Sequence, residues 1–153
     1  MSMDRLLATT RTLEGVLELA PAEGGPFPAI AWGDHFLYYA PDGEVPQREQ
    51  PFATVVTKDY PDDALCDLDP PGRWRLNVHV GAEVFRELTG EDPRDDPGSW
   101  DWTASDVVLP HPVYRAQGWV SIVCPDADPG GLAVRLVRRA HDDARRRAER
   151  REA

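Results

Sequence analysis

The sequence is poor in cysteine and lysine and has no long hydrophobic run. Its two cysteines, Cys66 and Cys124, lie in unrelated contexts and offer neither a disulfide framework nor a cysteine-rich zinc site. No window approaches the roughly 18 apolar residues that a membrane-spanning helix needs. Residues 1–12 lack the apolar core of a signal peptide, so we expect a cytoplasmic protein without membrane contact.

The familiar catalytic motifs are also missing. The chain has no G-x-G-x-x-G, no G-x-x-x-x-G-K-[ST], no G-x-S-x-G and no H-E-x-x-H. These absences argue against the common nucleotide-binding, serine-hydrolase and zinc-protease classes. The four histidines are far apart in the sequence and their spacing gives no metal signal, so we predict neither a metal site nor a cofactor.

Negative charge dominates the chain except at its C-terminal end. There are 27 acidic and 17 basic residues, a net charge of −10, yet residues 135–153 hold eight arginines against four acidic residues. An acidic body repels phosphate backbones, so we do not expect nucleic acid as the main partner. Arginines in the last turns of a helix complement its dipole and can lie against an acidic body, although they could also contact DNA or another protein.

Its 153 residues suit one domain, and the local patterns alternate between helix and strand. Hydrophobic spacing predicts helices over 3–13, over 81–88 and from Asp128 to about Arg147, and one helical turn within 103–109. β-prone runs predict strands over 16–19, 36–40, 52–58, 74–80 and 118–124, with a further short run at 30–32.

This order predicts a single α+β domain over residues 1–153. Consecutive strands joined by turns favour an antiparallel sheet of about five strands, with the N- and C-terminal helices packed on one face. The other face is either partly open or covered by the loops 59–73 and 91–102. We expect the basic helix end, residues 141–153, to project into solvent or fray. An exposed sheet edge could pair two copies into a homodimer.

The most informative segment is the strand 74–80, which alternates strictly. Trp74, Leu76 and Val78 fall on one face, and the polar residues Arg75, Asn77 and His79 fall on the other. A guanidinium, an amide and an imidazole on one face suit an anionic or hydrogen-bonding ligand, although a solvated sheet face also needs polar residues.

Other residues can be added to this predicted ligand-binding surface. Lys58 ends the strand 52–58 and would reach the rim of a pocket, or form an ordinary surface pair with Asp59. His111 and Tyr114 would add polar contacts. Aromatic side chains would provide stacking, or simply fill the core: Trp32, Tyr38 and Trp119.

Several segments resemble a family of small bacterial proteins of unknown function, over nearly the whole chain up to about residue 140. They are Leu13-Glu14-Gly15-Val16, Ala31-Trp32-Gly33-Asp34, the run 51–60, Arg75-Leu76-Asn77-Val78, Leu109-Pro110-His111-Pro112 and Gln117-Gly118-Trp119-Val120. More distantly, the layout resembles the MmcQ/YjbR-like proteins, through the turn at Gly15, the strand-end Lys58 and the strand at 118–120. That resemblance implies a compact α+β fold and a suggested DNA-binding role, from which this acidic chain with its inserted 59–102 region departs.

These observations lead to three functional hypotheses. The first is a small-molecule-binding protein that takes an anionic or aromatic ligand on the polar sheet face. The second is a small enzyme that uses His79 or His111 as a general base. The third is a DNA- or protein-contact module that uses the basic final helix.

Overall fold

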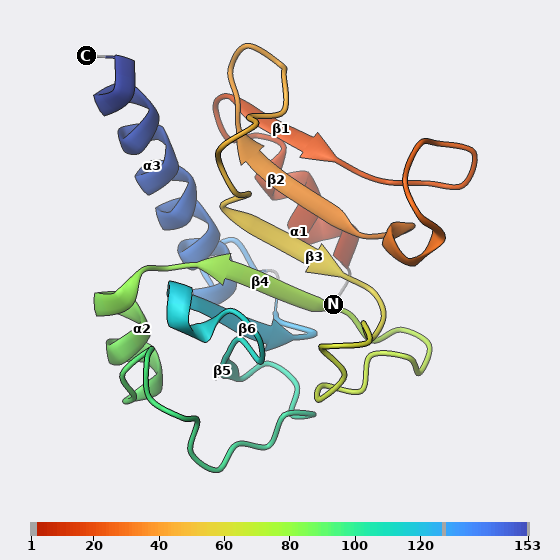
Figure 1. Ribbon diagram of the computed structural model, residues 1–153, viewed down its shortest axis with the longest axis vertical. Helices are drawn as coiled ribbons and strands as arrows, with labels where there is room; N and C mark the ends of the chain where they lie inside the picture. Colours follow the sequence, from red (N-terminus) through yellow and green to blue (C-terminus); the bar gives the residue numbers. More distant parts are fainter. Residues whose placement is uncertain (1–2, 127, 153) are drawn as a thin grey trace.

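A six-stranded sheet forms the centre of the protein in the computed structural model, which describes residues 3–126 and 128–152 (Figure 1). Every neighbouring pair of strands is antiparallel, in the order β1-β2-β3-β4-β6-β5. The strands are β1 (Val16–Leu19), β2 (His35–Tyr39), β3 (Ala53–Val56), β4 (Arg75–His79), β5 (Val108–Pro110) and β6 (Trp119–Val123).

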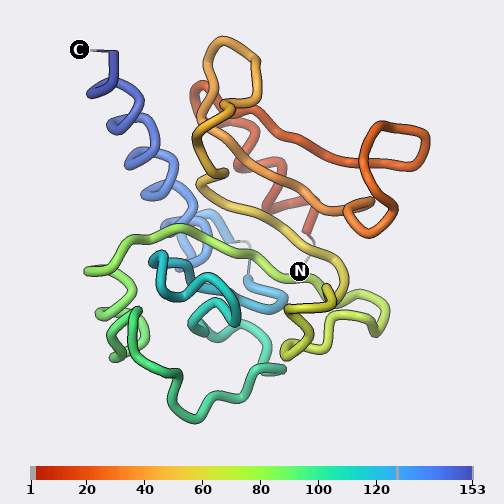
Figure 2. Tube along the Cα trace, viewed as in Figure 1, coloured from red at the N-terminus to blue at the C-terminus, as the bar shows by residue number. Residues whose placement is uncertain are grey.

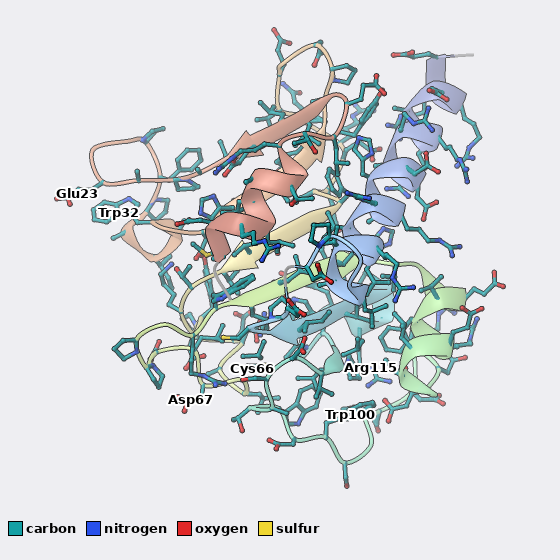
Figure 3. All side chains as sticks on the ribbon, turned by 180° about the vertical axis from the view of Figure 1, so that it is seen from behind. Glu23, Trp32, Cys66, Asp67, Trp100 and Arg115 are labelled. Carbon is teal, nitrogen blue, oxygen red and sulfur yellow. The ribbon has the colours of Figure 1, made fainter. Side chains whose placement is uncertain are left out.

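The first and last helices cover the same face of this sheet, which confirms the predicted α+β architecture. Seen from behind, α1 (Met3–Thr10) and α3 (Leu132–Glu152) both lie in front of the strands (Figure 3). Leu7 of α1 and Val137 of α3 are each 1% exposed and share one core with Leu76 and Val78. Burying each such side chain contributes about 1.5–3 kcal/mol. The short helix α2 (Ala82–Thr89) adds Phe85 to this core.

α3 remains helical to Glu152, beyond the expected end near Arg147. It is fixed to the body at His141, whose ring packs edge-on against Tyr39 and Phe52 and hydrogen-bonds the Glu14 carbonyl. Past that point its basic side chains pair with carboxylates: Arg145 and Arg146 with Asp142, and Arg151 with Glu49. These exposed pairs add little stability individually, but they direct the arginines toward acidic neighbours.

Two local predictions were wrong. The β-prone run at 30–32 overlaps a 3₁₀ turn, η1 (Ala29–Ala31), because the turn bonds back to Pro28 and the chain bends at Gly33. The helical turn expected within 103–109 is instead the edge strand β5, whose backbone pairs with β6. Both outcomes depend on hydrogen bonds that three-residue patterns do not reveal.

Loops cover part of the sheet face opposite α1 and α3. Cys66 and Leu68, from the connection between β3 and β4, form a second small core there with Val56, Leu109 and Val123. Trp100 and Trp102 pack against its edge, and Figure 2 shows their loop running around the end of the molecule beside β5. The strand β4 is therefore buried on both faces, because the loops shield the side that the helices leave open.

Gly118 brings the turn before β6 against the chain that leaves β4. Its φ is +83°, and a Cβ there would lie 2.9 Å from the Cα and carbonyl carbon of Gly81. The amides of Val80 and Gly81 both donate to the Gly118 carbonyl, at 2.9 and 3.1 Å. A side chain at this position would therefore collide with backbone that is already fixed by hydrogen bonds.

We expect Gly118→Ala to lower the free energy of unfolding by more than about 3 kcal/mol, because left-handed strain and a backbone collision add together. Gly43 is the matched control, since its φ is +78° but an added Cβ would meet nothing within 4 Å. Gly43→Ala should cost only the strain, about 1–2 kcal/mol. Urea unfolding of both variants measures the difference, and equal losses would contradict the close approach at Gly118.

Candidate functional site

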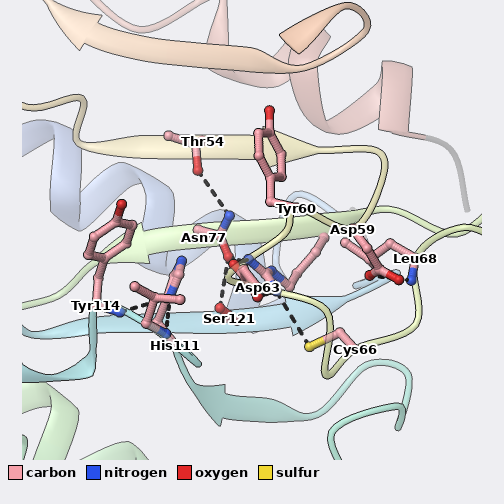
Figure 4. Close-up of polar contacts among 12 residues, drawn as sticks. Thr54, Asp59, Tyr60, Asp63, Cys66, Leu68, Asn77, His111, Tyr114 and Ser121 are labelled. Atoms are coloured by element: carbon pink, nitrogen blue, oxygen red, sulfur yellow. Dashed lines mark hydrogen bonds and ion pairs between the residues drawn. The ribbon is translucent and has the colours of Figure 1, made fainter. Parts of the chain in front are cut away.

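A hydrogen-bonded row of polar side chains crosses the sheet face opposite the helices. Thr54 of β3, Asn77 of β4 and Ser121 of β6 are direct neighbours in the strand register. Asn77 donates to the Thr54 hydroxyl at 3.0 Å, and its Oδ1 accepts from Ser121 at 2.7 Å and from Arg75 at 2.8 Å (Figure 4). These bonds explain why a residue type that is rare in strands occupies the middle of one.

Arg75 is the largest charged group buried on this face, with 2% of its surface exposed. Asp63 lies over it and accepts two hydrogen bonds from the guanidinium, at 2.9 and 2.5 Å. Burial alone would raise the pKa of Asp63, but the hydrogen bonds and positive charge of Arg75 outweigh it and hold that pKa below its ordinary value. The pair is therefore charged, and its positive member is already neutralised.

The segment that carries Asp63 is fixed by a second polar cluster around the fully buried Asp34. This carboxylate accepts hydrogen bonds from the Thr57 amide and hydroxyl, from Lys58 at 2.9 Å and from the Tyr60 hydroxyl. Burial, followed by the hydrogen bond and charge of Asp34, raises the pKa of Tyr60. The cluster holds the chain after β3 in place as it turns across the sheet.

Between these elements lies a cavity of about 500 Å³. Its volume is within the usual range for small-molecule sites. Thr54 and Asn77 of the polar row lie on its floor, and aromatic side chains make up much of the wall. The lining residues are Ala31, Phe36, Tyr38, Gln50, Pro51, Thr54, Val56, Tyr60, Asp62, Asp63, Arg75, Asn77, His111, Val113, Tyr114 and Trp119.

His111 enters this cavity from the turn after β5 and is 3% exposed. Its Nδ1 accepts the backbone amides of Val113 and Tyr114, each at 3.0 Å (Figure 4). Burial, reinforced by the charge of Arg75 and only partly offset by Asp63, lowers the pKa of His111 to about 3. The ring is therefore neutral, and because Nδ1 is an acceptor its proton is on Nε2.

The comparisons with known proteins place the chain in a family. A family model described as a family of unknown function (DUF6194) matches residues 1–153. The chain belongs to this family. No curated protein and no solved structure matches it. Membership in DUF6194 agrees with the resemblance to a family of unknown function noted in the sequence.

Most of the residues that the sequence predicts for ligand binding lie around the cavity in this DUF6194 chain. Those that line the cavity are Tyr38, Arg75, Asn77, His111, Tyr114 and Trp119. Alternation along β4 placed Arg75 and Asn77 on the same face, as expected. Arg75 is nevertheless committed to Asp63 and Asn77, so it does not supply a free charge for an anionic ligand.

Three nominated residues lie outside the cavity lining. Lys58 is turned away because its ammonium donates to Asp34 and to the carbonyl of Trp32. The indole of Trp32 donates to the Phe27 carbonyl. His79, at the end of β4, donates from Nε2 to the Gln117 carbonyl. It borders a separate hollow of about 220 Å³ that is also lined by Arg48 and Arg147.

The two histidines considered as general bases have different surroundings. The accessible nitrogen of His111 carries a proton, so it can donate a hydrogen bond but not accept a proton there. Burial and the charge of Arg147, partly offset by the Gln117 hydrogen bond, lower the pKa of His79, which faces the smaller hollow rather than the main cavity.

Sequence reasoning missed the residues that the β3–β4 connection brings over the sheet, namely Tyr60, Asp62 and Asp63. It also missed Thr54, although alternation along β3 could have placed it on one face with Val56. In the part of the chain that the structure describes, no three His, Cys, Asp or Glu side chains are arranged to hold a metal ion. No helix within 3–126 and 128–152 is long and apolar enough to cross a membrane.

We expect Asp63→Ala to lower the free energy of unfolding by about 3–5 kcal/mol, because it leaves the guanidinium of Arg75 buried and unpaired. The control is Asp62→Ala at the neighbouring exposed position, where we expect a change within about 0.5 kcal/mol. Urea denaturation measures both. A similar small loss in the two variants would show that Arg75 does not depend on Asp63.

Proposed function

We propose that this protein binds a small aromatic molecule in the cavity on the polar face of its sheet. The observation that carries the proposal is the combination of a 500 Å³ cavity with aromatic walls and a few fixed polar groups. Tyr38 and Trp119 come from two different strands, so a planar ligand could be contacted on more than one side. Apolar walls with a few convergent polar groups are typical of ligand sites.

The charges around the cavity favour an aromatic ligand over an anionic one. Among the described residues that line the cavity, Arg75 is the only cation, and Asp63 neutralises it. Asp62 at the rim adds a further negative charge. A carboxylate or phosphate would therefore meet a net negative site and would lose more hydration than it recovers.

The other sequence-based hypotheses receive less support. The DNA- or protein-contact hypothesis would use the arginines of α3, but several of these already pair with carboxylates, and the body of the chain is acidic. The more distant resemblance to MmcQ/YjbR-like proteins, with its suggested DNA-binding role, stays a prediction from the sequence. A cytoplasmic location and a homodimer formed through a sheet edge stay predictions from the sequence.

The proposal is tested by ligand-observed NMR with a set of small planar aromatic compounds, compared between wild type and Tyr38→Ala. Losing one stacking partner should weaken the bound compounds roughly tenfold. Trp32→Ala is the matched control, because it removes an aromatic ring that lies outside the cavity lining. If no aromatic compound binds, or if both variants weaken binding equally, the cavity is not the binding site.

A further inference from the structure

One ring nitrogen of His111, in the cavity wall, has a hydrogen atom to donate and no partner for it within the described part of the chain. The side chain of His111 is 3% exposed, and its Nδ1 accepts hydrogen bonds from two backbone amides. Among the described residues, no group accepts a hydrogen bond from its Nε2. Every fully buried side-chain nitrogen or oxygen among the described residues has a hydrogen-bond partner. Since Nε2 has none, it is not fully buried. The surface that Nε2 reaches is therefore the cavity that His111 lines.

The state of this nitrogen is fixed by the fold. Two amides pointing at Nδ1 require its lone pair, so the remaining proton of the neutral ring is on Nε2. The nearby carboxylate of Asp63 is directed toward Arg75, which donates to both of its oxygens, and no hydrogen bond joins it to Nε2. The cavity thus presents an N–H donor held in one orientation by its own turn.

A donor in this position selects among ligands. A compound that fills the cavity displaces the water that can solvate Nε2–H, so a ligand without an acceptor leaves the donor unsatisfied. An unpaired donor of this kind weakens the affinity for the ligand about 10- to 100-fold. The preferred ligand must therefore bring its own acceptor to Nε2.

The surrounding charges decide which kind of acceptor is favoured. A carboxylate would accept from Nε2, but it would also meet Asp62 and Asp63, with the single cation of the lining already paired. A carbonyl oxygen accepts the same hydrogen bond without carrying charge into the site. The uncharged acceptor is therefore the better match.

We propose that His111 determines the specificity of the cavity by donating from Nε2 to the ligand, and that the ligand class is an uncharged aromatic compound with a carbonyl-type acceptor. This inference rests on the proposed function, because it specifies the chemistry of the same site. It assigns His111 the role of a hydrogen-bond donor to the ligand rather than that of a base.

Three probes that share one ring test this assignment: benzamide has an uncharged carbonyl, benzoate an anionic acceptor, and toluene neither a charge nor an acceptor. Each is titrated into the full chain and followed by protein NMR. We expect benzamide to bind roughly tenfold more tightly than either of the others and to shift the Nε2–H resonance of His111.

The matched variant is His111→Asn. An asparagine carbonyl can accept from the amides two and three residues ahead, so it keeps the turn at Val113 and Tyr114, but it has no donor at the position of Nε2. We expect this variant to keep its melting temperature close to that of wild type and to lose its preference for benzamide over toluene. His111→Leu, which also leaves the two amides unpaired, should be less stable than His111→Asn.

The outcomes separate the two proposals. If the three probes bind wild type with equal affinity, or if His111→Asn keeps the preference for benzamide, the role of His111 is overturned while the aromatic site stands. If benzoate binds most tightly, the uncharged ligand class is wrong. If none of the probes binds, the proposed function fails, and the specificity inference fails with it.

Discussion

The buried charge of Arg75 is the constraint on which the open side of the sheet depends. A guanidinium in the middle of a strand, 2% exposed, must be paired or it would destabilise the fold by several kcal/mol. Asp63 supplies the pairing charge and comes from the connection between β3 and β4, so this connection has to cross the sheet. The cluster around Asp34 fixes the start of that crossing. The polar row, the covering loop and the cavity between them are consequences of one electrostatic requirement.

The same requirement decides what the cavity can bind. Because Asp63 consumes the positive charge, the site offers aromatic walls and hydrogen bonds rather than a counter-ion. Burial, with a smaller effect from Arg75, lowers the pKa of His111 and keeps it neutral, so the imidazole that faces the cavity is a donor with a fixed proton. The sequence suggested Arg75 for direct contact with an anion, but in the structure its guanidinium contacts Asp63 and Asn77.

How far the sequence could predict this arrangement depended on the range of the interactions. Alternation within residues 74–80 places Arg75 and Asn77 on one face because side-chain parity is a local property of a strand. The edge strand β5 could not be predicted, since three residues show no usable period and are defined by their pairing with β6. Lys58 was expected at the rim of the pocket. Its pairing with Asp34, 24 positions away, is a tertiary contact that no local sequence pattern reveals. The position of Asp63 over Arg75 depends on the path of an irregular loop, which no periodicity describes.

The central claim is that the cavity holds a neutral imidazole with its proton on the nitrogen that faces the cavity. Nitrogen-15 NMR of the histidine side chains tests it most directly, because the two ring nitrogens of His111 report their protonation separately. The account predicts a bare Nδ1 and a protonated Nε2 at neutral pH, with no further protonation until the pH approaches about 3. A proton on Nδ1, or an imidazolium that forms near pH 6.5, would contradict it.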